Sequence, residues 1–136
     1  MLENMKAWLQ TFPQWEGSIQ VDYLEAVPGS TGLYPKGITE LSRREDVLGN
    51  VKVRCRSTFL LRKTAVGTEE NARWLLAFQQ WVMEQNRLGL TPKFGDEPKT
   101  ERLLAADGRL ESHAQAGSSL YTVQLQAEFT KIYRGE

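Results

Sequence analysis

The chain has 136 residues, of which 40% are hydrophobic and 25% charged, and its 17 basic and 17 acidic residues give a formal net charge of zero. This length suits a single domain over residues 1–136, and a composition near the average of globular proteins argues against disorder over the whole chain. A neutral chain excludes attraction of the whole molecule to nucleic acid or to an anionic membrane, so any electrostatic function must be local to one face.

The first residues and the cysteine count bear on where the protein resides. The N-terminus lacks the basic start and continuous apolar run of a signal peptide, and no stretch approaches the roughly 20 apolar residues that span a bilayer. Cys55 cannot form an internal disulfide, because the sequence holds no second cysteine. We therefore expect a protein of a reducing cytoplasm with no membrane partner.

The first third of the chain predicts a helix, a strand and a long irregular segment. Residues 2–12 carry one apolar stripe at helical spacing before Pro13, which predicts a short N-terminal helix. Alternation over 18–26 predicts a first strand. Residues 28–50 are rich in glycine and proline and keep neither period, so we expect an irregular, functional or mobile segment with a short strand at Thr39 to Leu41.

The most regular pattern in the chain is the run Val51 to Arg62, VKVRCRSTFLLR, which alternates at the period of a strand. Its apolar members are Val51, Val53, Cys55, Phe59 and Leu61, and its basic members are Lys52, Arg54, Arg56 and Arg62. The pattern predicts a strand with one face in the core and one basic face turned outward. On the apolar face, Cys55 is expected to be a small buried core residue rather than a reactive thiol.

A second clear pattern predicts a long helix over about 69–88. Its apolar stripe at helical spacing consists of Trp74, Leu75, Phe78, Trp81 and Val82. Gly89 follows as a natural helix end. Such a stripe is more typical of a helix packed across a sheet than of a platform on which nucleic-acid bases stack.

The last third of the chain predicts a loop, a hairpin and a long strand. Proline and glycine interrupt residues 90–99, which are expected to form the loop. Asp107-Gly108 is favoured in tight turns, so Arg102 to Ala106 and Arg109 to Ser112 are predicted to pair around it. Alternation over Leu120 to Tyr133 predicts a final strand with a polar outer face.

These elements together predict an α+β fold. One mostly antiparallel sheet, with the N-terminal helix and one long central helix packed on one face, buries every apolar stripe at once. We find no internal repeat and no low-complexity segment in the sequence.

The sequence offers no group of residues typical of catalysis. His113 is the only histidine and stands in a Ser- and Gly-containing stretch, where we expect a solvated loop residue. A zinc site would need further histidine or cysteine ligands. The Gly29-Ser30-Thr31-Gly32 stretch lacks the Gly-Lys-Ser/Thr ending of a nucleotide-binding loop. We therefore predict a protein that is not an enzyme, with no catalytic residue, cofactor or metal.

The basic row of the strand over Val51 to Arg62 has three interpretations, which the sequence leaves open. Lys52, Arg54 and Arg56 would lie about 7 Å apart along a strand, which is comparable to the spacing of successive phosphates in nucleic acid. An exposed strand is also commonly decorated with basic residues for solubility and to block edge pairing. In the third interpretation the row binds an acidic patch on another copy, such as one built from Glu40, Glu45 and Asp46.

The C-terminal half resembles a known family over residues 68–134. The resemblance rests on the Glu69-Glu70-Asn71 helix start, the Trp-rich helix, and the segments PKFGD, AADGRL and LYTVQLQAEFTKIY. These segments are similar to those of minor capsid or tail-terminator (tail-completion) proteins encoded by tailed phages and prophages of Gram-positive bacteria. They are structural residues, so the resemblance carries over no catalytic residue.

The resemblance implies a structural protein of the head-tail junction. Tail terminators are α+β subunits that assemble into a ring, commonly a hexamer, which caps the finished tail tube and faces the head connector protein. The protein would then act in the host cytoplasm during assembly and in the virion, with DNA passing through its channel. A head-completion or connector protein is the alternative in the same biology. A small nucleic-acid-binding module that uses Lys52, Arg54 and Arg56 is the alternative from a different class.

Overall fold

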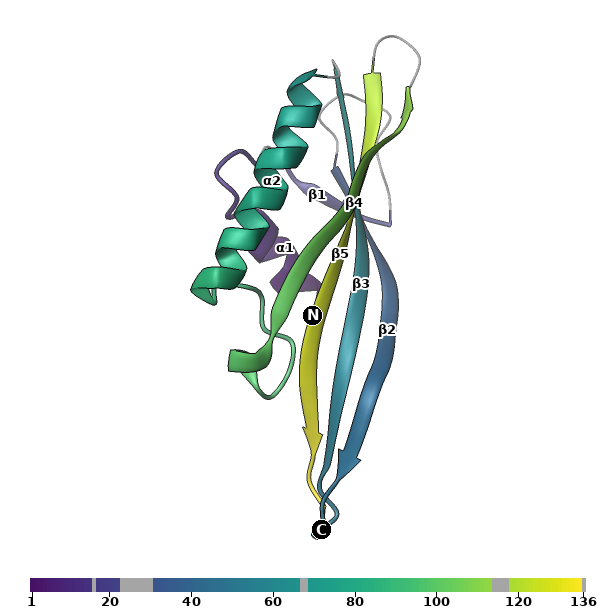
Figure 1. Cartoon of the computed structure of the whole chain (residues 1–136). Coiled ribbons are helices and arrows are strands. Elements are labelled where there is room, and N and C mark those ends of the chain that lie inside the picture. The colour runs from purple at the N-terminus through teal and green to yellow at the C-terminus, as the bar shows by residue number, and fades with distance from the viewer. Residues whose placement is uncertain (16, 23–30, 67–68, 114–117, 136) are drawn as a thin grey trace.

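A mixed five-stranded sheet with two α-helices on one side forms the protein (Figure 1). The structure, a computed structural model, describes residues 1–15, 17–22, 31–66, 69–113 and 118–135. Its helices are α1 (Leu2–Leu9), α2 (Glu69–Leu88) and the short 3-10 helix η1 (Pro98–Thr100). Its strands are β1 (Ile19–Val21), β2 (Thr31–Glu45), β3 (Val51–Val66), β4 (Arg102–His113) and β5 (Ser118–Tyr133). The predicted α+β class is confirmed.

The strand order is β1-β2-β3-β5-β4, which places β3 in the middle of the sheet. Strand β1 pairs with β2 in parallel, and the other neighbouring strands pair antiparallel. The predicted alternation of β3 is confirmed, since Val53, Cys55, Phe59 and Leu61 are buried between more exposed neighbours. The strand predicted over Val51 to Arg62 extends to Val66.

The two helices cover the apolar face of the sheet and close the main core. Phe78 and Val82 of α2 join Met5 and Leu9 of α1 in one buried cluster with residues of β3 and β5. The helix predicted over about 69–88 is α2, but it lies closest to β4 at one side of the sheet rather than over the sheet's centre (Figure 1). The core therefore lies between α1, α2 and the upper part of the sheet.

Aromatic rings hold α1 and the segment after it against α2. The Phe12 ring lies 5.5 Å from Phe78, 5.6 Å from Trp74 and 5.1 Å from Trp81 between centroids. Trp8 packs on Trp81 at 4.7 Å. Helix α1 ends at Leu9, three residues before the predicted end at residue 12, and the turn that follows still places Phe12 in the core.

A smaller apolar cluster continues below the helices. Val53, Cys55 and Phe129 form it, and Phe94 covers it with its ring edge-on to Phe129 at 6.0 Å. Phe94 belongs to the loop before η1, which approaches β5 so closely that a Cβ at Gly95 would lie 2.4 Å from the Thr130 carbonyl oxygen. Only glycine fits this approach, so the loop seals the lower apolar face.

Strands β2, β3 and β5 extend beyond the helical layer as a projecting tongue (Figure 1). At about 1.5 Å per residue, the 20 residues of α2 are about 30 Å long. The 16 residues of β3 extend for about 53 Å, so the helix cannot cover the full length of the strand. We call the tongue residues 37–45, 51–58 and 126–133 together with the turn 46–50.

The irregular segment predicted over 28–50 is wrong for residues 31–45, which form strand β2; residues 28–30 lie outside the described part. The predicted short strand at Thr39 to Leu41 is the middle of β2. Strand β2 escapes recognition because bulges between Pro35 and Gly37 and between Glu40 and Ser42 break its alternation. Beyond Tyr34 both of its faces are exposed, so no apolar stripe marks it.

The hairpin predicted around Asp107-Gly108 is also wrong. Strand β4 continues through these residues to His113, with a register shift against β5 between Ala106 and Arg109. A Cβ at Gly108 would lie 3.1 Å from side-chain atoms of α2, so glycine serves the close approach of the helix rather than a turn. His113, predicted in a loop, lies in β4 opposite Ser119.

The remaining boundaries differ by a few residues. The strand predicted over 18–26 is β1 for residues 19–21, and residues 23–26 lie outside the described part. The strand predicted over Leu120 to Tyr133 is β5, which begins two residues earlier at Ser118.

Replacing the central core ring tests this packing. Phe78 has no exposed surface and contacts α1, so Phe78→Ala should lower the free energy of unfolding by about 3–5 kcal/mol. Gln80→Ala, two residues along the same helix and exposed, should change it by less than about 0.5 kcal/mol. Urea denaturation followed by far-UV circular dichroism measures both; similar changes in the two variants would contradict the packing.

Candidate functional site

The open face of the sheet, opposite the helices, carries the basic row predicted from the sequence. Lys52, Arg54, Arg56 and Arg62 alternate with the buried residues of β3 and therefore project from this face. The row follows β3 from the tongue into the upper sheet. The structure thus confirms that the row is one surface, and it adds contacts that the sequence does not reveal.

Glu128 of β5 is the acid at the centre of this surface. Its carboxylate accepts hydrogen bonds from Arg56 Nη2 at 3.4 Å and from Arg102 Nη2 at 3.2 Å. Arg54 Nη2 lies 3.9 Å from the same carboxylate. The side chain of Glu128 is only 8% exposed, because the arginines from β3 and β4 cover it. We call Arg54, Arg56, Arg102 and Glu128 the arginine cluster.

The arginine cluster shifts the titration of Glu128. Burial alone raises the pKa of the Glu128 carboxyl, but the hydrogen bonds and positive charges of Arg102 and Arg56 outweigh it and hold the pKa below its usual value. The carboxylate therefore stays ionised, and it fixes the guanidinium groups in place through charge-assisted hydrogen bonds.

The other basic residues of the row have separate partners. Lys52 pairs with Glu97 at 2.9 Å across the loop before η1. Arg54 donates to the Thr100 carbonyl oxygen at 2.9 Å and to Thr130 Oγ1 at 3.0 Å. Farther up the strand, the Arg62 guanidinium lies 5.0 Å above the centre of the Tyr34 ring.

Of the three acidic residues proposed as a complementary patch, Glu40 and Asp46 have contacts within their own chain. Glu40 pairs with Arg43 at 2.8 Å. The Asp46 carboxylate accepts hydrogen bonds from the Asn50 side-chain amide at 3.0 Å, from the Asn50 backbone N–H at 3.0 Å and from the Leu48 backbone N–H at 2.9 Å. These bonds, the one from the Asn50 side chain first, lower the pKa of Asp46, and they order the tip of the tongue. Glu45 is exposed and lies beside Arg44 in the sequence. The acidic patch on another copy thus stays a prediction.

The described residues contain no cluster of three or more His, Cys, Asp or Glu side chains that could hold a metal ion. Cys55 is buried, and burial raises the pKa of its thiol, so the protonated and unreactive form dominates at neutral pH. This agrees with the predicted core role of Cys55.

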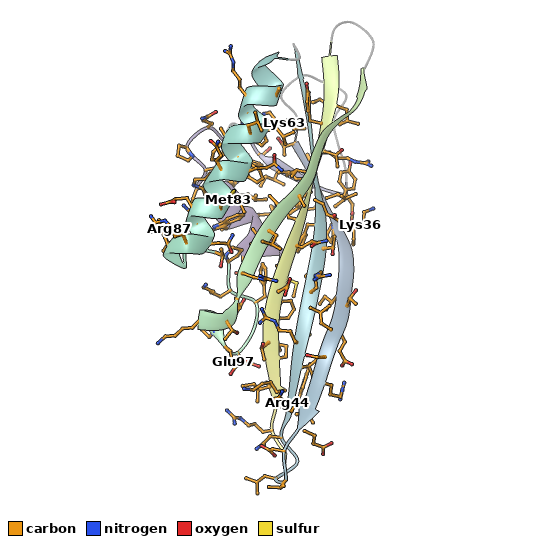
Figure 2. The ribbon with its side chains drawn as sticks, in the orientation of Figure 1. Lys36, Arg44, Lys63, Met83, Arg87 and Glu97 are labelled. Carbon is orange, nitrogen blue, oxygen red and sulfur yellow. The ribbon has the colours of Figure 1, made fainter. Side chains whose placement is uncertain are left out.

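Two groups of exposed apolar side chains lie on different parts of the molecule. One group lies at the tip of the tongue, where Val47 is fully exposed and Leu48 is mostly exposed on the turn ordered by Asp46. The other group lies on the outer side of α2, with Leu76 and Met83 one above the other at helical spacing (Figure 2 labels Met83). Patches of this kind mark interaction sites on soluble proteins.

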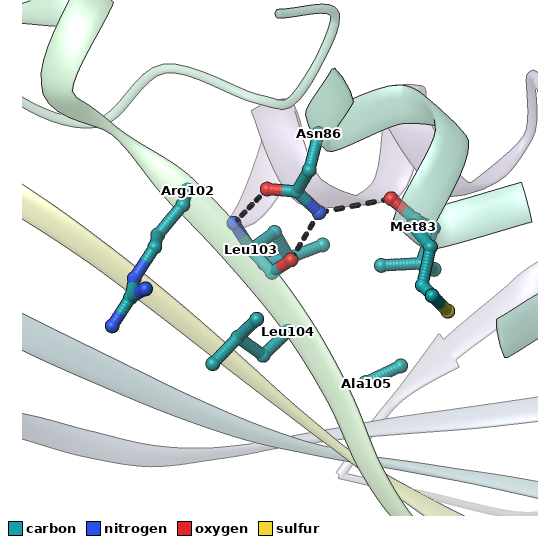
Figure 3. Close-up of a pocket in the computed structure, with 7 residues that line it drawn as sticks. Met83, Asn86, Arg102, Leu103, Leu104 and Ala105 are labelled. Carbon is teal, nitrogen blue, oxygen red and sulfur yellow. Dashed lines mark hydrogen bonds between the residues drawn. The ribbon is translucent and has the colours of Figure 1, made fainter. Parts of the chain in front are cut away.

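Met83 of the second group lines a groove between α2 and β4, and Arg102 of the arginine cluster lines it as well. The groove has a volume of about 340 Å³, and Met83, Leu104 and Ala105 are among its lining residues (Figure 3). Asn86 closes one end of it, because its side-chain amide bonds both the N–H and the C=O of Leu103 as a neighbouring strand would. The helix thus covers this stretch of the β4 edge and leaves an apolar hollow beside it.

Comparison with known proteins identifies no relative of this chain. No protein-family model matches the chain, and no curated protein shows significant sequence similarity to it. Within the residues that the structure describes, we find no helix long and apolar enough to cross a membrane.

Sequence reasoning found the basic row but missed its organising partners. Glu128 reads as one of several outward-facing polar residues of the last strand, and its contacts follow from the register Arg56↔Glu128↔Arg102. That register depends on two long-range strand pairings, which a single sequence does not specify. The groove likewise requires α2 to lie beside β4. The apolar stripe of α2 predicts which helix face is buried, but it does not predict which strand the helix lies beside.

Neutralising Glu128 tests the arginine cluster through stability. Glu128→Gln should lower the free energy of unfolding at pH 7 by roughly 1–3 kcal/mol, because the charge-assisted hydrogen bonds are weakened. Glu84→Gln removes a carboxylate whose pKa is also lowered, by Arg87 on the exposed side of α2, and it should have a much smaller effect.

The same variant tests the direction of the pKa shift. Because the folded-state pKa of Glu128 lies below the unfolded value, its contribution is fully present above about pH 4.3 and is lost as the pH falls through the folded-state pKa. Urea denaturation at pH 7 and pH 3 should therefore show a larger loss for the wild type than for Glu128→Gln. Equal losses would contradict the shift.

Proposed function

We propose that this protein is a non-enzymatic phage structural protein that acts at the head-tail junction as a tail terminator. Copies of the chain would form a ring, commonly a hexamer in such proteins, that caps the tail tube. The resemblance of residues 68–134 to tail-terminator proteins suggests the biology. The observation that carries the assembly argument is the presence of two different exposed apolar surfaces, one at the tongue tip and one at the α2–β4 groove.

Two different surfaces favour a ring over a simple dimer. A two-fold dimer uses the same patch twice, whereas a ring joins one patch of each subunit to a different patch of the next. The tongue tip projects from the body, and the groove is a hollow, so their shapes suit one another. We infer that the tongue of one copy docks on the groove of its neighbour.

The construction of the tongue tip supports this role. Asp46 bonds the backbone of Leu48 and Asn50 and thereby holds Val47 and Leu48 outward on an ordered turn. Gly49 adopts a φ of +83°, which the turn requires and glycine accepts at little cost. Such a tip gains nothing for the stability of an isolated subunit, but it presents two apolar side chains with little loss of conformational entropy on docking.

Mixing two interface variants tests the heterologous contact. The tongue variant V47D/L48D and the groove variant Met83→Glu should each remain monomeric, because each buries a charge in one half of the interface. An equimolar mixture should form a dimer but no ring, since one intact tongue and one intact groove remain. Size-exclusion chromatography with light scattering measures the masses.

Gln10→Glu serves as the control, because it adds a negative charge at an exposed site at the end of α1, outside both surfaces. It should assemble like the wild type. A wild type that stays monomeric at high concentration, or a mixture that forms no dimer, would contradict the assembly model.

Binding to isolated phage parts tests the position in the virion. A tail terminator should bind purified tail tubes that lack their cap and halt their growth, whereas a head-completion protein should bind the portal side of the head. Pull-down of the wild type against tails and against portals separates the two. Binding to portals alone would favour head completion, and binding to neither would contradict both roles.

A further inference from the structure

The arginine cluster carries more positive charge than the protein itself neutralises. Arg54, Arg56 and Arg102 surround the single carboxylate of Glu128, so two positive charges remain on this part of the open face. The face lies opposite the helices, and within the described residues no helix covers it (Figure 1). An excess of one charge sign on an open surface raises the local concentration of oppositely charged partners.

Glu128 orients the guanidinium groups and occupies only part of their hydrogen-bonding capacity. Arg56 and Arg102 each use Nη2 to bond its carboxylate, and in the described part of the chain neither has another acceptor. A guanidinium has five N–H donors in a rigid plane. The Nε of Arg56 is buried, so the Nη groups of Arg56 and Arg102 supply the donors for a ligand. The side chains are 38% exposed for Arg56 and 57% exposed for Arg102, so a ligand can reach them.

Two of the acids considered as partners of the basic row are already engaged within their own chain. Glu40 and Asp46, two of the three acids that could have met the basic row, are engaged by Arg43 and by the turn at the tongue tip. The excess positive charge of the cluster therefore favours an anion from outside the chain as its partner.

The geometry of the basic residues favours a repeating anion. Arg54 and Arg56 lie about 7 Å apart along β3, and Arg102 lies two strands away, about 10 Å across the sheet. Arg62, on the Tyr34 ring, lies about 20 Å farther along β3 and is separated from Arg56 by the uncharged Thr58 and Leu60. The spacing within the arginine cluster is comparable to that of the phosphates of a nucleic-acid backbone, to which arginine binds with two parallel hydrogen bonds.

We propose that the arginine cluster binds the phosphodiester backbone of nucleic acid, with Arg56 and Arg102 as the principal phosphate ligands and Glu128 as the residue that positions them. Contacts of this kind are independent of base sequence. The proposal goes beyond the assembly function, and a monomer would present the same open face. Arg102 also lines the α2–β4 groove, so the oligomeric state of each variant is measured beside its binding.

Fluorescence anisotropy with labelled oligonucleotides tests this site. A single strand and a duplex of equal length, each titrated with protein at several salt concentrations, give the affinity and its salt dependence. The variant R56Q/R102Q should bind both at least about tenfold more weakly at low salt. The slope of log K against log salt concentration should decrease by about two, one for each lost phosphate contact.

A matched control separates local from general electrostatics. R43Q/R87Q also removes two positive charges, but these lie outside the arginine cluster. Arg43 pairs with Glu40 on the opposite face of the tongue, and Arg87 pairs with Glu84 on α2. It should bind within about twofold of the wild type. Light scattering on the same samples reports the oligomeric state, so a failure of nucleic-acid binding is distinguishable from a failure of ring assembly.

Three results would overturn the proposal. One is the absence of wild-type binding at low salt, and the second is an equal loss of affinity in the two double variants. The third is competition by poly-glutamate that equals that of oligonucleotide at the same charge concentration, which would assign the face to an acidic protein segment. The first and third results need only the wild-type protein. If R56Q/R102Q does not fold, the single variant Arg102→Gln, at an exposed side chain, replaces it in the comparison.

Discussion

The two-faced alternation of β3 is the constraint on which the rest of the structure depends. Its apolar side chains must be covered, and α1, α2 and the loop carrying Phe94 cover them in succession. The same alternation places its basic side chains on the opposite face, where Arg54 and Arg56 contact Glu128. One strand thus sets both the core and the charged surface, and a shift of its register by one residue would exchange the two.

The unequal lengths of helix and strand produce the second functional feature. A helix of the length of α2 covers only part of strands as long as β3, so the sheet continues past the helical layer as the tongue. Helix α2 also lies to one side, next to β4, which leaves the apolar groove under Met83. The tongue tip and the groove therefore arise from the way one helical layer sits on a longer sheet, and together they supply the two unlike surfaces that a ring needs.

The sequence predicts elements well where burial imposes a period and poorly where it does not. The aromatic stripe from Trp74 to Val82 and the alternation after Val51 gave α2 and β3 correctly, because both face the core. The pattern of strand β2 predicts an irregular segment, because bulges and exposure on both faces remove its alternation. Asp107-Gly108 predicts a turn, but Gly108 instead allows the close approach of α2, which is a tertiary contact. The basic row was predicted, but Arg102 and Glu128 joined it only through strand register.

Covalent trapping of the contact between tongue and groove tests the assembly model most directly. With Leu48→Cys and Leu104→Cys in one chain, mild oxidation should produce a ladder of disulfide-linked oligomers that ends at a closed ring; the native Cys55 is buried and does not take part. Each single variant should stay unlinked, because its cysteine has no partner cysteine across a heterologous contact. Linked dimers from a single variant, or no linkage in the double variant, would contradict the model.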